Sequence, residues 1–436
     1  MRILRQGEKE FEAYLLGVED RIMEDGLRLE RKVRSILTDV RRRGDEALLH
    51  YTQVFDGVRV PIHHLKVRGA EVKQAYRKIP SDFLKTLEKA ALRVRKFHQI
   101  QHKNLIRGGL RMGGEEKGIR LGQLIRPLER VGIYVPGGKA SYPSTVLMAA
   151  IPAKVAGVRE IVMTTPPQRE GINPAVLVAA DLAGINQIYR VGGVQAIGAL
   201  AYGTSSIPRV DKIVGPGNRY VAAAKRLVFG IVDIDMVAGP SEILIIADEK
   251  TPAAFVAADL ISQAEHDEKA MSVLITVSES LGRAVRDEVN RQIATLKRRK
   301  IAQRSLNERG AILIVKNIEE AIGLANRIAP EHLELALSRA TSLLKHVKHA
   351  GAVFLGLHTP EAIGDYLAGP NHILPTGGTA RFASPLGAED FIKRINVINF
   401  TQHALGAFEK DLKRFTEWEG LEGHYRAVQK RVEGRR

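Results

Sequence analysis

Short apolar runs alternate with alanine-rich, helix-patterned segments from Val131 onwards, and this alternation constrains the fold more than any other feature of the chain. The apolar runs predict strands, and the segments that follow them predict helices. Strands that alternate with helices in this way indicate a parallel sheet covered by helices. The predicted strands are 131–135, 160–164, 187–191 and 212–214, and the predicted helices are 143–157, 174–183, 194–202 and 219–229.

A second set of the same kind starts near Ile243. Helical patterns, including 252–266 and 279–297, lie between its apolar runs. The sequence therefore predicts an α/β protein with two parallel-sheet modules. An old duplication would explain two such modules, although no clean sequence repeat is visible. The predicted strands of the second module are 243–247, 271–277, 311–315, 333–337 and 352–355.

The segments outside the two modules have a different texture. Residues 1–130 show helical periodicity, clearest at 20–51 and 80–98, and predict a mostly helical region. A Gly- and Pro-rich stretch at 364–387 predicts a loop. Residues 388–436 are predicted to form a small helical tail, which is too short to bury its own core. We therefore expect this tail to pack on another body, such as a second subunit.

The formal net charge of +17 raises the question of nucleic-acid binding. Residues 131–250 contain 11 Lys and Arg against 9 Asp and Glu, so the surplus lies outside this region. The basic runs at 41–43 and 297–300 lack interleaved aromatic residues and fall on helix-patterned segments. These features favour a solvated basic surface, and we expect no nucleic-acid partner. A basic nucleic-acid-binding protein is the alternative from another class, and it predicts salt-sensitive binding to polynucleotide.

Two absences in the sequence bear on localisation and on chemistry. No apolar run approaches the ~18 residues of a membrane span, and the N-terminus lacks a signal-peptide core. We therefore expect a cytoplasmic protein without membrane contact. Cysteine is missing, so a metal site must use His, carboxylate or amide ligands. For the same reason an aldehyde could not be oxidised through a cysteine adduct, and a hydrated aldehyde is the obvious route.

Glycine turns close several strands, at 136–138, 192–193, 215–217 and 238–240. Small residues at the carboxyl edge of a parallel sheet let the backbone approach a ligand. One such turn is ordinary, but four in one region indicate a ligand crevice. Neither the dinucleotide fingerprint G-x-G-x-x-G nor the phosphate loop G-x-x-x-x-G-K-[ST] occurs. These patterns alone leave a dinucleotide plausible but unsupported.

Several polar residues could carry chemistry. Gln263 and His266 are three residues apart in a helical stretch and therefore share a helix face. They could bind a metal there, or they could be ordinary surface or core residues. Glu331 and His332 are adjacent at a predicted strand start. They offer two proton-transfer groups, or else a helix-terminal acid beside a structural histidine. Further residues in the loop and tail could complete a zinc site, namely Asp365, His372, Glu419 and His424.

The chain resembles the histidinol dehydrogenase family. The resemblance runs in order from Val131 nearly to the C-terminus, and its longest block, around His372, is highly specific. The segments that carry it are Val131-Gly-Ile-Tyr-Val-Pro-Gly-Gly138, Val191-Gly-Gly-Val-Gln-Ala-Ile197, Val210-Asp-Lys-Ile-Val-Gly-Pro-Gly-Asn218, Met236-Val-Ala-Gly-Pro-Ser-Glu-Ile-Leu244, Ser262-Gln-Ala-Glu-His266, Ala329-Pro-Glu-His-Leu333, Gly369-Pro-Asn-His-Ile-Leu-Pro-Thr-Gly-Gly-Thr-Ala-Arg-Phe382 and Glu419-Gly-Leu-Glu-Gly-His424.

The resemblance implies a role for each matching residue. It implies one zinc ion per subunit, with the ligands Gln263, His266, Asp365 and, from the tail of the other subunit, His424. It implies an acid–base pair, Glu331 and His332, and NAD contacts from Tyr134, Gln195 and Asn218. The substrate would touch the four zinc ligands, His332 and three further residues, Ser241, His372 and Glu419.

The resemblance also implies the architecture. The family fold is an intertwined homodimer with shared active sites and two incomplete Rossmann-like modules, which would explain the missing fingerprint. We accordingly expect an N-terminal arm at 1–27 and a first module formed by 28–130 with 243–387. Residues 131–242 would form the second, NAD-binding module, and 388–436 the tail exchanged between subunits.

The implied reaction is the four-electron oxidation of L-histidinol through L-histidinal to L-histidine with two NAD⁺, the last steps of histidine biosynthesis. A zinc- and NAD-dependent dehydrogenase of another polar alcohol, such as a sulfonated diol, is the alternative on the same scaffold. His372 and Glu419 discriminate between the two. They suit an imidazole and an ammonium group, whereas an anionic substrate would favour a basic residue.

Overall fold

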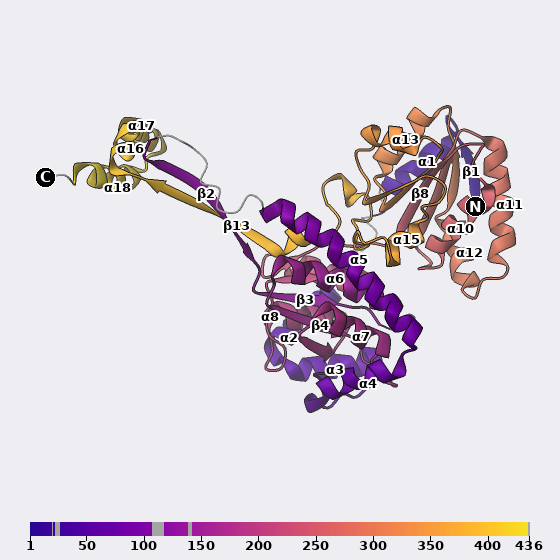
Figure 1. Ribbon diagram of the computed structural model, residues 1–436, viewed down its shortest axis with the longest axis horizontal. Coiled ribbons are helices and arrows are strands. Elements are labelled where there is room, and N and C mark those ends of the chain that lie inside the picture. The colour runs from indigo at the N-terminus through magenta and orange to yellow at the C-terminus, as the bar shows by residue number, and fades with distance from the viewer. Residues whose placement is uncertain (20, 22–26, 107–116, 138–141, 435–436) are drawn as a thin grey trace.

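The computed structural model describes residues 1–19, 21, 27–106, 117–137 and 142–434. Two parallel sheets, each covered by helices, form two lobes, and a long two-stranded ribbon carries the C-terminal tail away from them (Figure 1). The predicted α/β class with two parallel-sheet modules is confirmed. Parts of the sequence expectations fall outside the described residues, namely Gly138 of the first glycine turn, the end of the expected arm and the last two residues of the tail.

The five-stranded sheet belongs to the 131–242 module and has the order β5-β4-β3-β6-β7. The chain enters at the central strand, moves outwards to β5 and returns to the other side, which is the order of a dinucleotide-binding sheet without its last strand. Its strands are β3 (Arg130–Tyr134), β4 (Glu160–Thr165), β5 (Gln187–Arg190), β6 (Lys212–Val214) and β7 (Asp233–Ile234). Its own helices are α6 (Pro143–Ala156), α7 (Pro174–Ala183), α8 (Gly193–Tyr202) and α9 (Arg219–Val228).

The six-stranded sheet has the order β1-β10-β9-β8-β11-β12. From β8 onwards its strands follow the same order as those of the first sheet, so the two modules share a topology that the sequence does not show as a repeat. Its strands are β8 (Glu242–Ala247), β9 (Met271–Thr276), β10 (Ala311–Ile314), β11 (His332–Ala336) and β12 (Ala352–Leu355). Its helices are α10 (Ala253–Ala264), α11 (Glu279–Ile293), α12 (Arg299–Glu308), α13 (Ile318–Ile328), α14 (Ala340–Leu343) and α15 (Glu361–Tyr366).

The N-terminal segment is part of the six-stranded sheet. Strand β1 (Arg2–Arg5) pairs in parallel with β10, and α1 (Lys9–Glu19) follows it. Phe11 and Leu15 of this helix are buried in the same core cluster as strands β9 and β10. The expected N-terminal arm is therefore an edge strand and a packed helix.

Residues 28–106 cover the five-stranded sheet, which differs from their expected grouping with 243–387. They form α2 (Leu27–Arg43), α3 (Asp45–Asp56), α4 (Gly69–Lys78) and α5 (Ser81–Ile106). Helix α2 packs on α8 and α9, α4 on α7, and α5 on α6. Gly198 allows the close approach of α2, because a Cβ atom there would lie 3.2 Å from Val40. Helical periodicity predicts a buried face, but it does not say which sheet that face covers.

A strand was missed in the tail. Strand β13 (Ile392–Phe400) pairs antiparallel with β2 (Ile119–Pro127) along nine residues, so the expectation of a wholly helical tail was wrong there. The ribbon ends in α16 (Gln402–Ala407), α17 (Glu409–Glu419) and α18 (Glu422–Glu433), far from both lobes (Figure 1). Among the residues from 401 to 434, only Ala404 and Thr416 are buried. The tail therefore lacks a core of its own, as predicted.

Short 3-10 helices at Ile62–His64, Leu344–His346, Thr379–Arg381 and Ala388–Phe391 complete the structure. Within the described ranges, no helix combines the length and apolar character that crossing a bilayer requires.

Candidate active site

A cavity of about 1280 Å³ lies between the two sheets. One wall is formed by residues that follow the carboxyl ends of the five-stranded sheet, including Gly137 after β3 and Asn218 after β6. The opposite wall is formed at the amino ends of the six-stranded sheet, including Ser241 before β8 and His332 at the start of β11. Three of the four predicted glycine turns line this cavity, while the turn at 192–193 is not among its lining residues. The predicted crevice is thus present, and the second sheet contributes its other edge.

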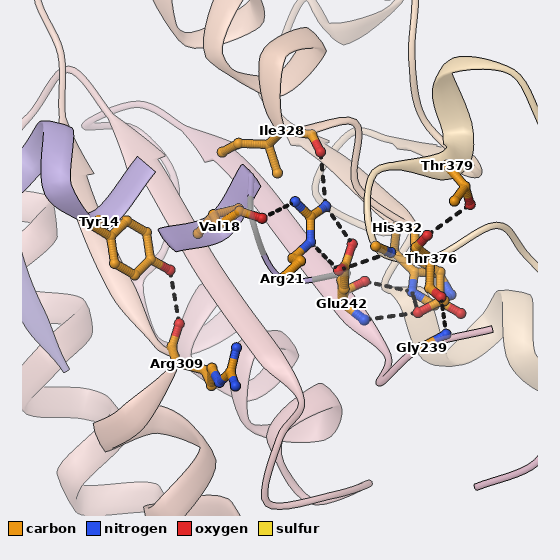
Figure 2. A network of polar contacts seen from close by, with 12 residues as sticks. Tyr14, Val18, Arg21, Gly239, Glu242, Arg309, Ile328, His332, Thr376 and Thr379 are labelled. Carbon is orange, nitrogen blue, oxygen red and sulfur yellow. Dashed lines mark hydrogen bonds and ion pairs between the residues drawn. The ribbon is translucent and has the colours of Figure 1, made fainter. Parts of the chain in front are cut away.

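Glu331 and His332 are both held by Glu242 of the neighbouring strand, whose contact with His332 can be followed in Figure 2. The backbone N–H of Glu242 donates to Glu331 Oε2 at 2.8 Å, and its carbonyl oxygen lies 2.9 Å from His332 Nδ1. A carbonyl oxygen only accepts hydrogen bonds, so Nδ1 carries the ring proton. This leaves His332 Nε2 as the unprotonated nitrogen, 3.9 Å from Glu361 Oε1. The arrangement provides an oriented base beside a carboxyl group.

Burial tunes both members of this pair. Burial lowers the pKa of His332 to about 4, so the imidazole stays neutral and able to take a proton at ordinary pH. Burial also raises the pKa of Glu331 well above its usual range, and the negative charge of Glu242 adds to this rise. A carboxyl group with a raised pKa is a stronger base when ionised, which suits proton exchange with water or substrate.

A group of metal-ligand side chains faces the same cavity. His332, Glu361 and Asp365 offer ligand atoms that all lie within 4.8 Å of one another. Gln263, on α10, is completely buried, and neither atom of its amide has a hydrogen-bond partner among the described residues. His266, just beyond α10, is exposed on the cavity wall. Three of the four predicted zinc ligands, namely Gln263, His266 and Asp365, therefore line one cavity.

The donor set fits a divalent cation. A buried amide without a partner costs about 1–3 kcal/mol, which a ligand would offset. Burial and then the charge of Asp365 raise the pKa of Glu361 to about 8, and burial raises that of Asp365 to about 6. Two carboxyl groups crowded in this way are stabilised as anions by a cation. Nitrogen and oxygen donors of these types are ligands that zinc accepts.

Glu361 was missed by the sequence analysis. It begins α15, four residues before Asp365, so the two side chains lie on one face of the same helix. Glu361 is 2% exposed, and its Oε2 accepts a hydrogen bond from Ser262 at 3.3 Å. The four-residue spacing between Glu361 and Asp365 was the available signal in the sequence. The sequence alone does not distinguish a buried acid from a solvated one.

Two predicted substrate contacts lie beside the donor group. His372 Nδ1 donates to the backbone oxygen of Asp365 at 2.8 Å, and its Nε2 lies 3.4 Å from the hydroxyl of Thr145. Burial lowers the pKa of His372 to about 4, so this ring is also neutral. Ser241 lines the cavity directly before Glu242. Both residues are therefore within the same cavity as the acid–base pair.

Two of the three predicted cofactor residues lie on the wall formed by the five-stranded sheet. Tyr134 ends β3, and its hydroxyl accepts a hydrogen bond from the N–H of Gly193 at 3.2 Å. Asn218 caps α9 by accepting hydrogen bonds from the N–H groups of Tyr220 and Val221. Gln195 is fully buried behind Gly193, outside the cavity lining, and its amide has no partner among the described residues. Tyr134 and Asn218 line the cavity.

Glu419 and His424 do not join the cavity. Glu419 ends α17 and His424 lies in α18, and both are exposed at the far end of the ribbon (Figure 1). Within one chain, the cavity therefore contains all the predicted zinc and substrate residues except these two of the tail.

Comparison with known proteins identifies the family of the chain. The sequence profile described as histidinol dehydrogenase matches residues 20–432. The chain belongs to the histidinol dehydrogenase family. A histidinol dehydrogenase of Bacillus cereus is 54% identical over 405 residues, covering 93% of each chain. One from Syntrophotalea carbinolica is 51% identical over 432 residues, covering 99% of each.

Solved structures agree with the sequence relatives. The crystal structure of histidinol dehydrogenase from Elizabethkingia anophelis superimposes with a TM-score of 0.92 at 36% identity, covering 100% of this chain and 98% of the other. The family recognised from the motifs is therefore confirmed, and this member of the histidinol dehydrogenase family is an oxidoreductase.

Proposed function

We propose that the chain oxidises L-histidinol through L-histidinal to L-histidine, with two NAD⁺ and one zinc ion per subunit, in the last steps of histidine biosynthesis in the cytoplasm. The observation that carries this proposal is the single cavity in which a neutral imidazole, a carboxyl group and amide and carboxylate donors meet in a histidinol dehydrogenase family chain. The reaction needs a base for two oxidations and a site that retains the aldehyde between them.

The buried donors support the metal assignment. We assign Gln263, His266 and Asp365 as ligands, with His424 of the partner subunit as the fourth. Zinc would bind the amine and imidazole nitrogens of the substrate and so orient it. The ligand atom of Glu361 lies within 4.8 Å of that of Asp365, so Glu361 would add negative charge to the site that holds the ion. The unpartnered amide of Gln263 is the observation that most directly calls for a ligand.

Tyr134, Gln195 and Asn218 are assigned to NAD⁺, which supplies the hydride acceptor for each oxidation. Two of them lie at the carboxyl edge of a sheet with dinucleotide-binding strand order, where such ligands bind. The buried, unpartnered amide of Gln195 supports its inclusion, although its side chain lies behind the cavity lining.

His332 serves as the base in both oxidations. Its Nδ1 proton is held by the carbonyl oxygen of Glu242, so Nε2 takes the hydroxyl proton of histidinol as hydride leaves the carbinol carbon. Glu331 then takes a proton from the water that adds to the aldehyde carbon, while His332 Nε2 returns its proton to the carbonyl oxygen, giving a hydrate and restoring His332 as a base. His332 Nε2 takes a hydroxyl proton of this hydrate as the second hydride leaves. The chain has no cysteine, which agrees with a hydrate in place of a thiohemiacetal.

A homodimer with shared sites completes the assignment. Glu419 and His424 are exposed at the end of a ribbon that leads away from their own cavity (Figure 1). Trp418 and Phe415 of the same tail are 94% and 69% exposed, which is unusual for large apolar side chains without a partner. These features support a tail that docks on a second copy of the chain and there contacts the substrate and the zinc ion. His372 and Ser241 are the remaining substrate contacts.

One assay tests the proposal. The purified protein is expected to produce two NADH per L-histidinol consumed, and a chelator should abolish this turnover. A sulfonated diol serves as the rival substrate, and polynucleotide as the rival ligand. Turnover of the diol without turnover of histidinol, or salt-sensitive polynucleotide binding without any NAD-linked activity, would contradict the proposal.

A further inference from the structure

A buried ion pair lies next to the acid–base pair (Figure 2). Arg21 Nε donates to Glu242 Oε1 at 2.6 Å, and its Nη2 donates to Oε2 at 3.1 Å. The side chains of Arg21 and Glu242 are 8% and 4% exposed. A planar guanidinium that binds both oxygens of a carboxylate fixes its orientation as well as its charge. Glu242 is therefore held firmly at the first position of β8.

Glu242 is the residue that holds both Glu331 and His332. Its backbone N–H binds the carboxyl group of Glu331, and its carbonyl oxygen binds His332 Nδ1. Its carboxylate also accepts from the N–H of Gly377 at 3.1 Å, in the loop that follows His372. Any rotation of Glu242 would therefore move two groups that exchange protons in the proposed reaction.

Arg21 also reaches the segment that leads into the acid–base pair. Its Nη2 donates to the carbonyl oxygen of Ile328 at 2.9 Å, and its Nη1 donates to that of Val18. Ile328 ends α13, three residues before Glu331. The next residue, Ala329, has a φ of 50°, and among the described residues it is the only non-glycine residue with a positive φ. Such a conformation is strained for a residue with a Cβ atom and persists only where the surroundings enforce it.

We propose that the Arg21–Glu242 ion pair is a positioning device that holds Glu331 and His332 in their reactive orientation. It fixes the backbone groups that bind them on one side and the strained turn that precedes them on the other. Arg21 and Glu242 are assigned as positioning residues, not catalytic ones. This inference rests on the proton-transfer roles proposed above for Glu331 and His332.

Two variants test the device. Arg21→Lys keeps the charge but loses the fork that binds both carboxylate oxygens, and Glu242→Gln keeps the shape but removes the ion pair. Each should lower kcat by about 10- to 100-fold, because small displacements of reacting groups have effects of that size. KM for L-histidinol and for NAD⁺ and the bound zinc per chain should change by less than about twofold, because the loss is confined to the chemical step.

A neighbouring ion pair provides the matched control. Arg327 Nε donates to Glu19 Oε1 at 2.6 Å, tying the end of α1 to α13 only two residues from Arg21, and the two side chains are 38% and 35% exposed. It tethers the same elements as Arg21 does but makes no contact with Glu242. Glu19→Gln should therefore leave kcat unchanged. All variants are compared at a temperature at which thermal unfolding shows them folded.

The outcomes separate the inference from the proposed function. Unchanged kcat in both Arg21→Lys and Glu242→Gln, with kcat lowered in His332→Ala, would overturn the positioning role alone. Loss of zinc, a raised KM or an equal loss in Glu19→Gln would also overturn it, because these results indicate a general structural role. Full activity of His332→Ala would overturn the proposed function itself. If Arg21→Lys does not fold, Glu242→Gln decides the question.

Discussion

The ammonium group of Lys225 and the carboxylate of Asp235 form an ion pair whose side chains are only 2% and 1% exposed. Both bind the glycine turn after β6, since Lys225 Nζ donates to the carbonyl oxygen of Gly215 at 3.0 Å and Asp235 accepts from its N–H at 2.8 Å. Gly215 has a φ of 116°, and a Cβ atom there would lie 2.1 Å from the carbonyl oxygen of Tyr134. The ion pair thus holds a glycine turn whose shape no other residue can adopt.

Lys225→Met should lower both stability and NAD⁺ affinity. The Asp235 carboxylate would remain buried without its partner, which costs about 3–5 kcal/mol of unfolding free energy. The loosened turn leads directly to Asn218, so the dissociation constant for NAD⁺ should rise. Urea unfolding and NAD⁺ titration measure the two effects. Wild-type NAD⁺ affinity in a folded Lys225→Met protein would contradict this prediction.

Lys212→Met is the matched control on the same sheet. Its ion pairs with Asp233, at 3.0 Å, and with Asp390, at 3.8 Å, involve carboxylates that are 51% and 31% exposed. Because Asp233 can be solvated when the lysine is lost, its charge is not left stranded. We expect NAD⁺ affinity to stay at the wild-type value in this variant.

Gln263 and Gln195 are both buried amides, and we expect their substitution to affect different ligands. Both are completely buried, and neither amide has a partner among the described residues. Gln263→Leu should lower zinc content and leave NAD⁺ affinity unchanged, whereas Gln195→Leu should weaken NAD⁺ binding and leave zinc content unchanged. Metal analysis after dialysis and NAD⁺ titration measure these effects. Equal zinc content in both variants would remove Gln263 from the ligand set.

The shared-site proposal predicts complementation between two inactive chains. His266→Ala removes a ligand from the cavity, and His424→Ala removes the ligand expected from the tail. A mixed dimer contains one cavity with both defects and one with neither, so partial activity should return when the two variants are unfolded and refolded together. NADH production from L-histidinol reports the recovery. Mixed dimers that form but stay inactive would refute the shared site.

The strands of both modules could be predicted because runs such as 243–247 and 271–277 are mostly apolar, as is typical of buried parallel strands. The strand β13 was missed because most of its residues are exposed, so its sequence carries no buried face. The partner sheet of α2 was also missed, since an amphipathic pattern specifies only that one face is covered.

The candidate site shows the same division. Glu331 and His332 could be singled out because they are adjacent in the sequence, and the residues proposed for zinc and NAD⁺ because they match family motifs. Glu361 and Arg21 could not be singled out from the sequence. Their importance comes from burial beside groups that are distant in the chain, and an isolated Glu or Arg in a sequence resembles the many that face solvent.

Glu334 should make the metal-free protein less stable as the pH rises. Its Oε1 accepts from the N–H of Glu361 at 2.7 Å, and burial, followed by the charge of Asp259, raises its pKa to about 9 from an unfolded value near 4.5. The folded state therefore holds a proton that the unfolded state releases, and stability falls as the pH rises between these values. The fall is at most about 1.4 kcal/mol per pH unit for one group.

Glu334→Gln isolates this effect. Glutamine can still accept the hydrogen bond from Glu361, but it has no proton to lose. The stability of the variant relative to the metal-free wild type should increase with pH, which urea unfolding at about pH 5, 7 and 8.5 measures. A constant difference across this range would show that Glu334 does not titrate in the predicted window.

Glu331→Gln should separate the two oxidations. In the proposed mechanism, His332 acts in both hydride transfers, whereas Glu331 acts only when water adds to the aldehyde. A general acid–base group typically contributes about 10²–10⁴-fold in rate, so the variant should keep most of the first oxidation and lose most of the second. The glutamine amide can still accept the hydrogen bond from the N–H of Glu242, which Glu331 Oε2 accepts at 2.8 Å, so the position of His332 should be preserved. Single-turnover measurements that start from histidinol and, separately, from histidinal distinguish the two steps, and histidinal should accumulate only in this variant.

His332→Ala should slow both steps. Equal slowing of both steps in Glu331→Gln would refute the division of labour between the two residues, and an unchanged product ratio with reduced stability would identify Glu331 as a structural residue.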